Sequence, residues 1–226
     1  MQLSQFEVLD DMLIGDLKVV QDTRLYRFTS DSVLLTKFAT VKTGDVVADF
    51  CSGCGIVGFH LHALYPDKKL SFTLFEMQKP LSELSKKTIE YNRFENFKTE
   101  NIRLQEIPSD YNGKFSLVVC NPPYERGGLE NETYEKAVCR KEITLTLQEI
   151  VKATAFALKF GGRVAILHRA DRVAEVCHAF KNANIEIKKM QFVSGKAGAK
   201  PYLVMIEGVK GGKPSCEVLP TLINEK

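Results

Sequence analysis

The chain has 226 residues, of which 44% are hydrophobic and 26% are charged, and its formal net charge is +3. This composition suffices for one buried core, and it excludes a low-complexity chain and a protein that coats nucleic acid through charge alone. Residues 1–11 contain no basic cluster followed by an apolar stretch, and no segment is apolar over the length of a membrane span. We therefore expect a cytoplasmic location.

The first predicted helix begins at Ser30 or Asp31, both of which are residue types that cap helix N-termini, and ends near Val41. The apolar run at 46–50 then indicates a buried strand, and a glycine turn leads into a second helix that ends near Leu64. This order of strand, turn and helix is typical of nucleotide-binding α/β proteins.

The turn after this strand has the features of a nucleotide site. Gly53 and Gly55 permit a tight turn and a close approach of the backbone to a ligand. Glu76 follows the apolar run at 70–75, where its carboxylate can accept hydrogen bonds from both ribose hydroxyls. A nicotinamide or flavin dinucleotide would also suit this pattern. Asp49, at the strand end, favours S-adenosylmethionine, because a carboxylate there suits a cationic amino acid group better than a pyrophosphate.

A later apolar run at 115–120 leads directly into the tetrapeptide Asn121-Pro122-Pro123-Tyr124. An exocyclic purine amine is a poor nucleophile because its lone pair is delocalised into the ring. The Asn121 side-chain oxygen can accept one N–H of such an amine and the Pro122 carbonyl the other, which favours a nucleophilic nitrogen. Tyr124 would stack on a base turned out of its strand. The alternative is that Asn-Pro-Pro serves only to end a strand and turn the chain.

Strands and helices alternate along the rest of the chain, with predicted helices at 79–92, 142–159 and 171–182, and strands at 101–104, 163–168, 185–193 and 201–207. We expect Gly161-Gly162 to stop the second of these helices and Asp171 to cap the third. The last two strands are joined by a connection too short for a crossover helix, so they should pair antiparallel. The pattern predicts an α/β fold with a mostly parallel sheet and helices on both faces.

The order of strand, Asp49, glycine turn, Glu76 and Asn-Pro-Pro-Tyr resembles that of class I methyltransferases that act on amino groups. Over nearly its whole length the chain resembles the tRNA adenine N6-methyltransferase family that modifies the adenine beside the anticodon of one valine tRNA. The segments that carry the resemblance are 16–35, 49–58 and 118–124, with a tail at 206–212 similar to that of the Gram-positive branch. DNA adenine, ribosomal guanine and release-factor glutamine methyltransferases share the catalytic tetrapeptide.

The resemblance implies a Rossmann-like, seven-stranded class I methyltransferase sheet with an antiparallel C-terminal strand in residues 46–226. Residues 1–45 would form an N-terminal extension whose helix packs on the cofactor site. S-adenosylmethionine is the implied cofactor, and its candidate binding residues are Asp31, Asp49, Cys51, Gly53, Gly55, Glu76, Met77, Glu106 and Asn121. The polar group that holds its adenine would be Gln105 or Glu106, or both are ordinary loop residues. The candidate catalytic residues are Asn121, Pro122, Pro123 and Tyr124.

Two of the six cysteines, Cys51 and Cys54, form a Cys-x-x-Cys pattern that also occurs in zinc and redox sites. No second pair has ligand spacing, so we interpret both as small side chains in a tight turn and all six as reduced thiols. Methyl transfer from a sulfonium requires no metal, and none is expected. We interpret the four histidines as surface or packing residues: His60, His62, His168 and His178.

Basic residues suggest where RNA would bind. Between 188 and 213 there are six lysines and one acid, and Lys196 and Lys200 are the chosen candidates for RNA contact. Arg126 and Arg140 lie after the catalytic motif, and by resemblance Arg140 would approach an RNA phosphate. The lysines could equally form an ordinary solvated face. We expect tRNA as the partner, no membrane, and a monomer.

Other acceptors remain open at this stage. The same motif would suit a base of ribosomal RNA or DNA, or the glutamine amide of a release factor. Only 45 residues precede the first strand of the sheet, which argues against the release-factor enzymes with their additional helical domain. A noncatalytic cofactor-binding or RNA-binding module is a further alternative.

Overall fold

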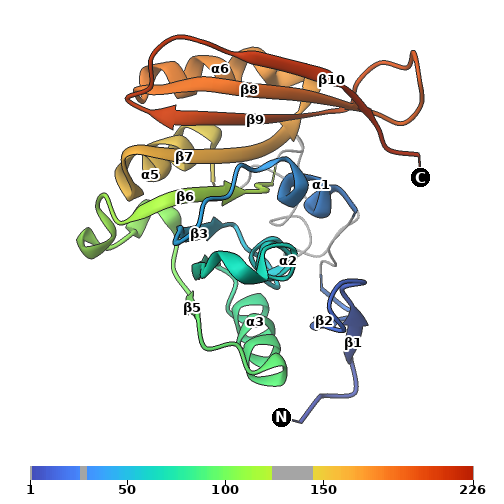
Figure 1. Cartoon of the computed structure of the whole chain (residues 1–226). Helices are drawn as coiled ribbons and strands as arrows, with labels where there is room; N and C mark the ends of the chain where they lie inside the picture. Colours follow the sequence, from blue (N-terminus) through green and yellow to red (C-terminus); the bar gives the residue numbers. More distant parts are fainter. Residues whose placement is uncertain (1, 26–29, 124–144, 226) are drawn as a thin grey trace.

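A central sheet of eight strands organises the protein in this computed structural model, which describes residues 2–25, 30–123 and 145–225. The strand order is β10-β8-β9-β7-β6-β3-β4-β5 (Figure 1). The strands are β3 (Val46–Phe50), β4 (Ser71–Phe75), β5 (Phe97–Glu100), β6 (Phe115–Cys120), β7 (Leu158–Arg169), β8 (Ile185–Ser194), β9 (Leu203–Lys210) and β10 (Glu217–Ile223). Strands β7, β6, β3, β4 and β5 are parallel, and β9 is antiparallel to both of its neighbours.

The mostly parallel α/β sheet and the antiparallel pairing of β8 with β9 are confirmed. The predicted count of seven strands is wrong, because β10 pairs parallel with β8 and adds an eighth strand at the edge. The last strand of the chain is therefore parallel to β8, and the antiparallel strand is the one before it. Most side chains of β10 are exposed, so the apolar pattern that identifies a buried strand is weak there.

Helices cover both faces of the sheet, as predicted. Val47 and Leu117 belong to a core shared with helices α1 (Ser30–Phe38), α2 (Ile56–Leu64) and α3 (Lys79–Asn92). Their neighbours along the strands, Ala48 and Val118, point to the opposite core with α5 (Leu147–Ala157) and α6 (Val173–Asn182). This alternation follows from the two-residue period of a strand, and both faces are apolar because both are buried.

The predicted helix at 142–159 is too long at both ends within the described residues. Helix α5 begins at Leu147, because Thr146 and Glu149 form a reciprocal capping box. It ends at Ala157, and Leu158 already pairs with Phe115 in the sheet. The glycines expected to stop the helix therefore lie inside β7, where the pairing with β6 is irregular.

Three other boundaries also differ from the prediction. The strand predicted at 101–104 lies earlier, at Phe97–Glu100, an edge strand that has no continuous apolar run. Asp171 does not cap α6, since it lies in a 3-10 turn (Ala170–Arg172) and bonds Arg169. Helix α1 ends at Phe38 rather than near Val41.

An antiparallel hairpin of β1 (Glu7–Asp11) and β2 (Lys18–Asp22) precedes α1 and was not predicted. It lies beside α3 (Figure 1), where Val20 N–H donates to Thr88 Oγ1 at 2.9 Å and Lys87 Nζ pairs with Glu7. No helix within the described part of the chain has the length and apolar character of a membrane span.

Candidate functional site

The candidate site residues follow the carboxyl ends of three neighbouring parallel strands. Phe50 of β3 is in register with both Phe75 of β4 and Cys120 of β6. Glu76 and Asn121 are the next residues along their strands, so the fold places them at the same edge of the sheet. This edge is where open α/β sheets bind their ligands.

Asp49 is 1% exposed, and its carboxylate has two different environments. One oxygen accepts a hydrogen bond from the Gly58 backbone N–H at 2.9 Å, which connects β3 to the first turn of α2. The other oxygen is buried and has no hydrogen-bond partner among the described residues. Burial raises the Asp49 pKa to about 7, the Gly58 bond opposes this, and the negative charge of Glu76 adds to it. Such a carboxyl would gain from a cationic ligand group.

Glu76 joins the glycine turn to the end of β4. Its carboxylate accepts hydrogen bonds from the Gly53 N–H at 2.9 Å and the Gln78 N–H at 2.8 Å. Burial raises the Glu76 pKa, and these backbone bonds partly offset the shift. Each carboxylate oxygen retains further acceptor capacity, as hydrogen bonds to ribose hydroxyls would require.

The glycine turn depends on conformations that side chains disfavour. Gly53 has φ +56°, and a Cβ added there would meet open space. Gly55 has φ +88°, and a Cβ added there would lie 2.5 Å from the Phe59 ring. Cys51 also has a positive φ, of 58°. The turn therefore combines three left-handed residues with close packing at Gly55.

Asn121 is held by helix α1. Its Nδ2 donates to the Ser32 hydroxyl at 3.0 Å, while its buried Oδ1 has no hydrogen-bond partner among the described residues. Pro122 and Pro123, the next two residues, are buried. The Nδ2 end of the carboxamide is therefore engaged by Ser32, and the Oδ1 end is left as a hydrogen-bond acceptor. An acceptor is what an amine N–H requires as a partner. Tyr124, Arg126 and Arg140 lie outside the described residues.

The cysteines near the site are thiols in a buried setting. A hydrogen bond with Cys120, together with burial, raises the Cys51 pKa well above its usual value, and burial raises the Cys54 pKa to about 12. High pKa values make thiols poor nucleophiles and poor metal ligands. Among the residues that the structure describes, no three His, Cys, Asp or Glu side chains form a metal-binding group.

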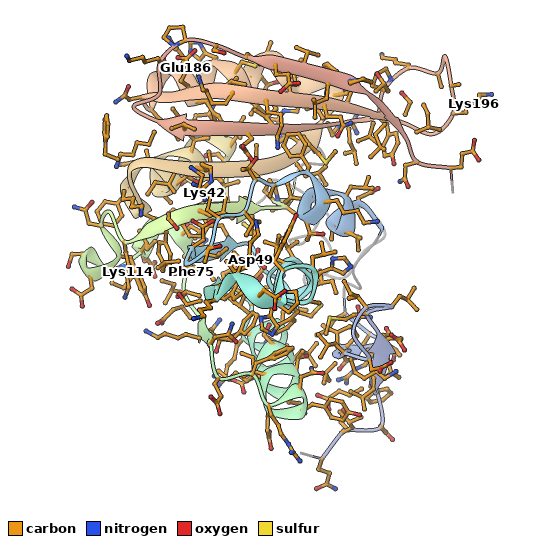
Figure 2. All side chains as sticks on the ribbon, in the orientation of Figure 1. Lys42, Asp49, Phe75, Lys114, Glu186 and Lys196 are labelled. Atoms are coloured by element: carbon orange, nitrogen blue, oxygen red, sulfur yellow. The ribbon has the colours of Figure 1, made fainter. Side chains whose placement is uncertain are left out.

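The structure also describes four other predicted site residues, on α1, in a 3-10 turn and in a loop. Asp31 is buried on α1, and its Oδ1 accepts from Tyr202 Oη at 3.3 Å. Glu106 is exposed in a 3-10 turn (Leu104–Glu106), beyond the observed end of β5. Lys196 and Lys200 are exposed in the loop between β8 and β9, and Figure 2 shows Lys196 at the tip of that loop.

Sequence reasoning missed two residues at the site, Ser32 and Asn101. Asn101 follows the last residue of β5, and its Nδ2 donates to the carbonyls of Glu76 and Met77 at 2.8 and 3.0 Å. The strand boundary, had it been placed at 100, would have identified Asn101 as the polar group after the strand. Ser32 has no comparable signal, because its contact with Asn121 spans 89 residues of sequence.

Three of the four histidines take part in packing, and His178 is exposed at the surface, where its Nε2 lies 2.9 Å from Asn182 Nδ2. His60 is buried and its Nδ1 lies 3.0 Å from Thr36 Oγ1, and His62 packs against the Phe94 and Phe97 rings. Burial lowers the pKa of both residues. Burial also lowers the pKa of His168, in β7, to about 4, so this side chain is neutral at physiological pH.

Comparison with known proteins agrees with this geometry. The methyltransferase small domain family matches residues 28–193, which include the glycine turn, Glu76 and the Asn-Pro-Pro motif. The chain belongs to this family. It is therefore a methyltransferase.

Two curated relatives share low sequence identity with this chain. Both carry the name tRNA1(Val) (adenine(37)-N6)-methyltransferase. The protein from Trichodesmium erythraeum is 21% identical over 78% of this chain and 77% of its own length. That from Bacteroides thetaiotaomicron is 23% identical over 78% of this chain and 74% of its own length.

Among solved structures, a predicted O-methyltransferase from Agrobacterium tumefaciens superposes with a TM-score of 0.68. It is 17% identical, and the alignment covers 85% of this chain and 86% of that protein. At this identity the similarity establishes the fold, which is that of the methyltransferase sheet predicted from the sequence.

Proposed function

We propose that this methyltransferase acts on the exocyclic amine of an adenine in tRNA. The observation that carries the proposal is the Asn121 carboxamide, whose donor is occupied by Ser32 and whose buried acceptor lacks a partner among the described residues. An exocyclic amine carries two N–H donors, so it matches an acceptor that is already desolvated and oriented. The names of the two curated relatives support the choice of adenine and of tRNA.

The residues at the carboxyl edge fit the proposed cofactor. Asp49 offers a buried, unpartnered oxygen to a cationic amino acid group, and Glu76 offers acceptor capacity to ribose hydroxyls. Asn101, which follows β5 beside Met77, adds a polar group where the adenine would lie. When bound, S-adenosylmethionine supplies an electrophilic methyl group on a sulfonium.

The chain itself would then position the acceptor amine. Asn121 Oδ1 accepts one amine N–H and the Pro122 carbonyl accepts the other, which draws the nitrogen lone pair out of conjugation with the ring. In the proposal, Tyr124 stacks on the base. An unpaired loop nucleotide is the favoured target, because unstacking it costs little.

The loop that carries Lys196 and Lys200 supports contact with RNA near this site. Strand β8 is antiparallel to β9, which is antiparallel to β7, so β8 ends at the same edge of the sheet as β6. The loop after β8 therefore projects from the edge that bears Asn121. The other residues at 195–200 are Gly and Ala, so the two ammonium groups carry the charge of this segment.

Charge reversal tests this surface. We expect Lys196→Glu with Lys200→Glu to weaken tRNA binding about tenfold or more at moderate salt, because each lost phosphate contact also reduces counterion release. Affinity for S-adenosylmethionine should stay unchanged. Lys42→Glu with Lys114→Glu is the matched control, since it changes the net charge equally at exposed positions far from Lys196 (Figure 2). Equal weakening by both pairs would refute a local RNA surface.

Asn121→Ala tests the chemistry. We expect methyl transfer to fall by at least about a hundredfold while cofactor still binds, because the desolvated acceptor for the amine is gone. Transfer to tRNA close to the wild-type rate would contradict the assignment of Asn121.

A further inference from the structure

One end of the Asn121 carboxamide is bound by a hydroxyl on helix α1. Ser32 is 3% exposed, and its Oγ accepts the hydrogen bond from Asn121 Nδ2 at 3.0 Å. In this orientation Oδ1 is the atom left for a ligand, and it is buried without a partner among the described residues. We propose that Ser32 is a positioning residue, which holds the Asn121 acceptor toward the target amine. This inference rests on the proposed function.

The orientation of the Asn121 carboxamide matters because this group has nearly the same shape after a half turn about its Cβ–Cγ bond. Such a turn exchanges an acceptor for a group with two N–H donors. An NH₂ group in the position of Oδ1 would face the N–H groups of the target amine, donor against donor, and would repel the amine instead of binding it. Catalysis therefore needs one of two orientations of similar shape, and the Ser32 bond is made in the productive one.

The helix that carries Ser32 is itself fixed on both sides of this residue. Asp31, the preceding residue, accepts a hydrogen bond from Tyr202 Oη, and Tyr202 in turn accepts one from Asn224 Nδ2 at 2.9 Å. One turn later, Thr36 Oγ1 lies 3.0 Å from His60 Nδ1 on α2. A hydroxyl presented from an anchored helix restrains its partner better than one on a mobile loop.

A substitution at Asn121 separates orientation from simple structural support. The two oxygens of a carboxylate are equivalent after a half turn, so Asn121→Asp presents an acceptor whichever way it lies. Loss of Ser32 should consequently harm the asparagine enzyme and scarcely affect the aspartate enzyme. A merely structural role of Ser32 would predict the same loss in both.

The experiment measures kcat, KM for tRNA and cofactor affinity in four proteins: wild type, Ser32→Ala, Asn121→Asp and the double variant. We expect Ser32→Ala to lower kcat about tenfold in the asparagine background, and by less than about twofold in the aspartate background, with cofactor affinity unchanged. Ser32→Thr, which keeps the hydroxyl, should recover most of the activity. Equal losses in both backgrounds, or no loss in either, would overturn the proposal.

A second readout needs no substrate. The side-chain NH₂ resonances of Asn121, assigned by their disappearance in Asn121→Asp, should show slow proton exchange in the wild type and fast exchange in Ser32→Ala. Unchanged exchange would overturn the positioning role. Wild-type protein that methylates no tRNA yet shows the protected resonance would instead refute the proposed substrate and leave the role of Ser32 standing.

Discussion

Cofactor affinity should rise with pH because Asp49 must lose its proton to receive a cation. Burial raises the pKa of this carboxyl to about 7 in the free protein, so much of the population is neutral below that pH. A bound cationic amino acid group would stabilise the ionised form and lower the pKa again. Binding of the cofactor therefore releases a proton, and affinity follows the ionised fraction of Asp49.

The magnitude follows from that pKa. With a pKa of about 7, Asp49 is about one tenth ionised at about pH 6 and about three quarters ionised at about pH 7.5, so affinity should rise about eightfold between them. Isothermal titration calorimetry in two buffers of different ionisation enthalpy would measure both the affinity and the released proton.

The free protein should show the opposite trend in stability. A carboxyl whose pKa is raised on folding stabilises the folded state below its unfolded pKa, and this contribution is lost as pH rises through the folded value. For Asp49 the window runs from about pH 4 to about pH 7. Rising pH thus lowers the free energy of unfolding contributed by this group while it strengthens cofactor binding.

Two variants make the prediction specific. Asp49→Asn should bind cofactor more weakly and lose most of the pH dependence. Glu76→Gln should keep the dependence but move its midpoint to lower pH, because the charge of Glu76 raises the Asp49 pKa. A wild-type affinity that falls with pH, or an undiminished rise in Asp49→Asn, would refute the reasoning.

Two further predictions concern stability, measured by urea unfolding. Gly55→Ala should cost about 3 kcal/mol or more, because φ is +88° and the added Cβ would lie 2.5 Å from the Phe59 ring, whereas Gly53→Ala, strained but unobstructed, should cost about 1 kcal/mol. Equal losses would contradict the packing argument. Arg163→Met should cost about 3–5 kcal/mol, because it leaves the Asp45 carboxylate buried without its cation at 2.5 Å. Adding Asp45→Asn should restore part of that loss, and no recovery would show that the charge is not responsible.

The elements predicted correctly from sequence are those with strong local signals. Helix 79–92 and the helix ending at Leu64 were placed at their observed ends, since one shows amphipathic periodicity and the other follows a glycine turn. The runs that became β3 and β6 are buried on both faces, so their apolar character is continuous. Asp49, Glu76 and Asn121 were predicted as site residues because each lies within the last two positions of an apolar run or directly after one.

What the sequence did not reveal depends on partners far away in the chain. Strand β10 contains Pro220 and is mostly exposed, so its local sequence pattern does not predict a strand. It forms at the edge of the sheet by pairing with β8. The predicted position of β5 lay four residues too late in the chain, because this strand is also at an edge of the sheet and has no continuous apolar run. The bond from Asn121 to Ser32 is a tertiary contact that no periodicity encodes.

Methyl transfer to defined acceptors is the most direct test of the proposed function. The protein is incubated with methyl-labelled S-adenosylmethionine and with separate pools of unmodified tRNA, ribosomal RNA, DNA and release factor, and the labelled pool is digested to identify the product. The proposed function predicts N6-methyladenosine in the tRNA pool and none with Asn121→Ala. Label in another pool, or transfer that survives loss of Asn121, would contradict it.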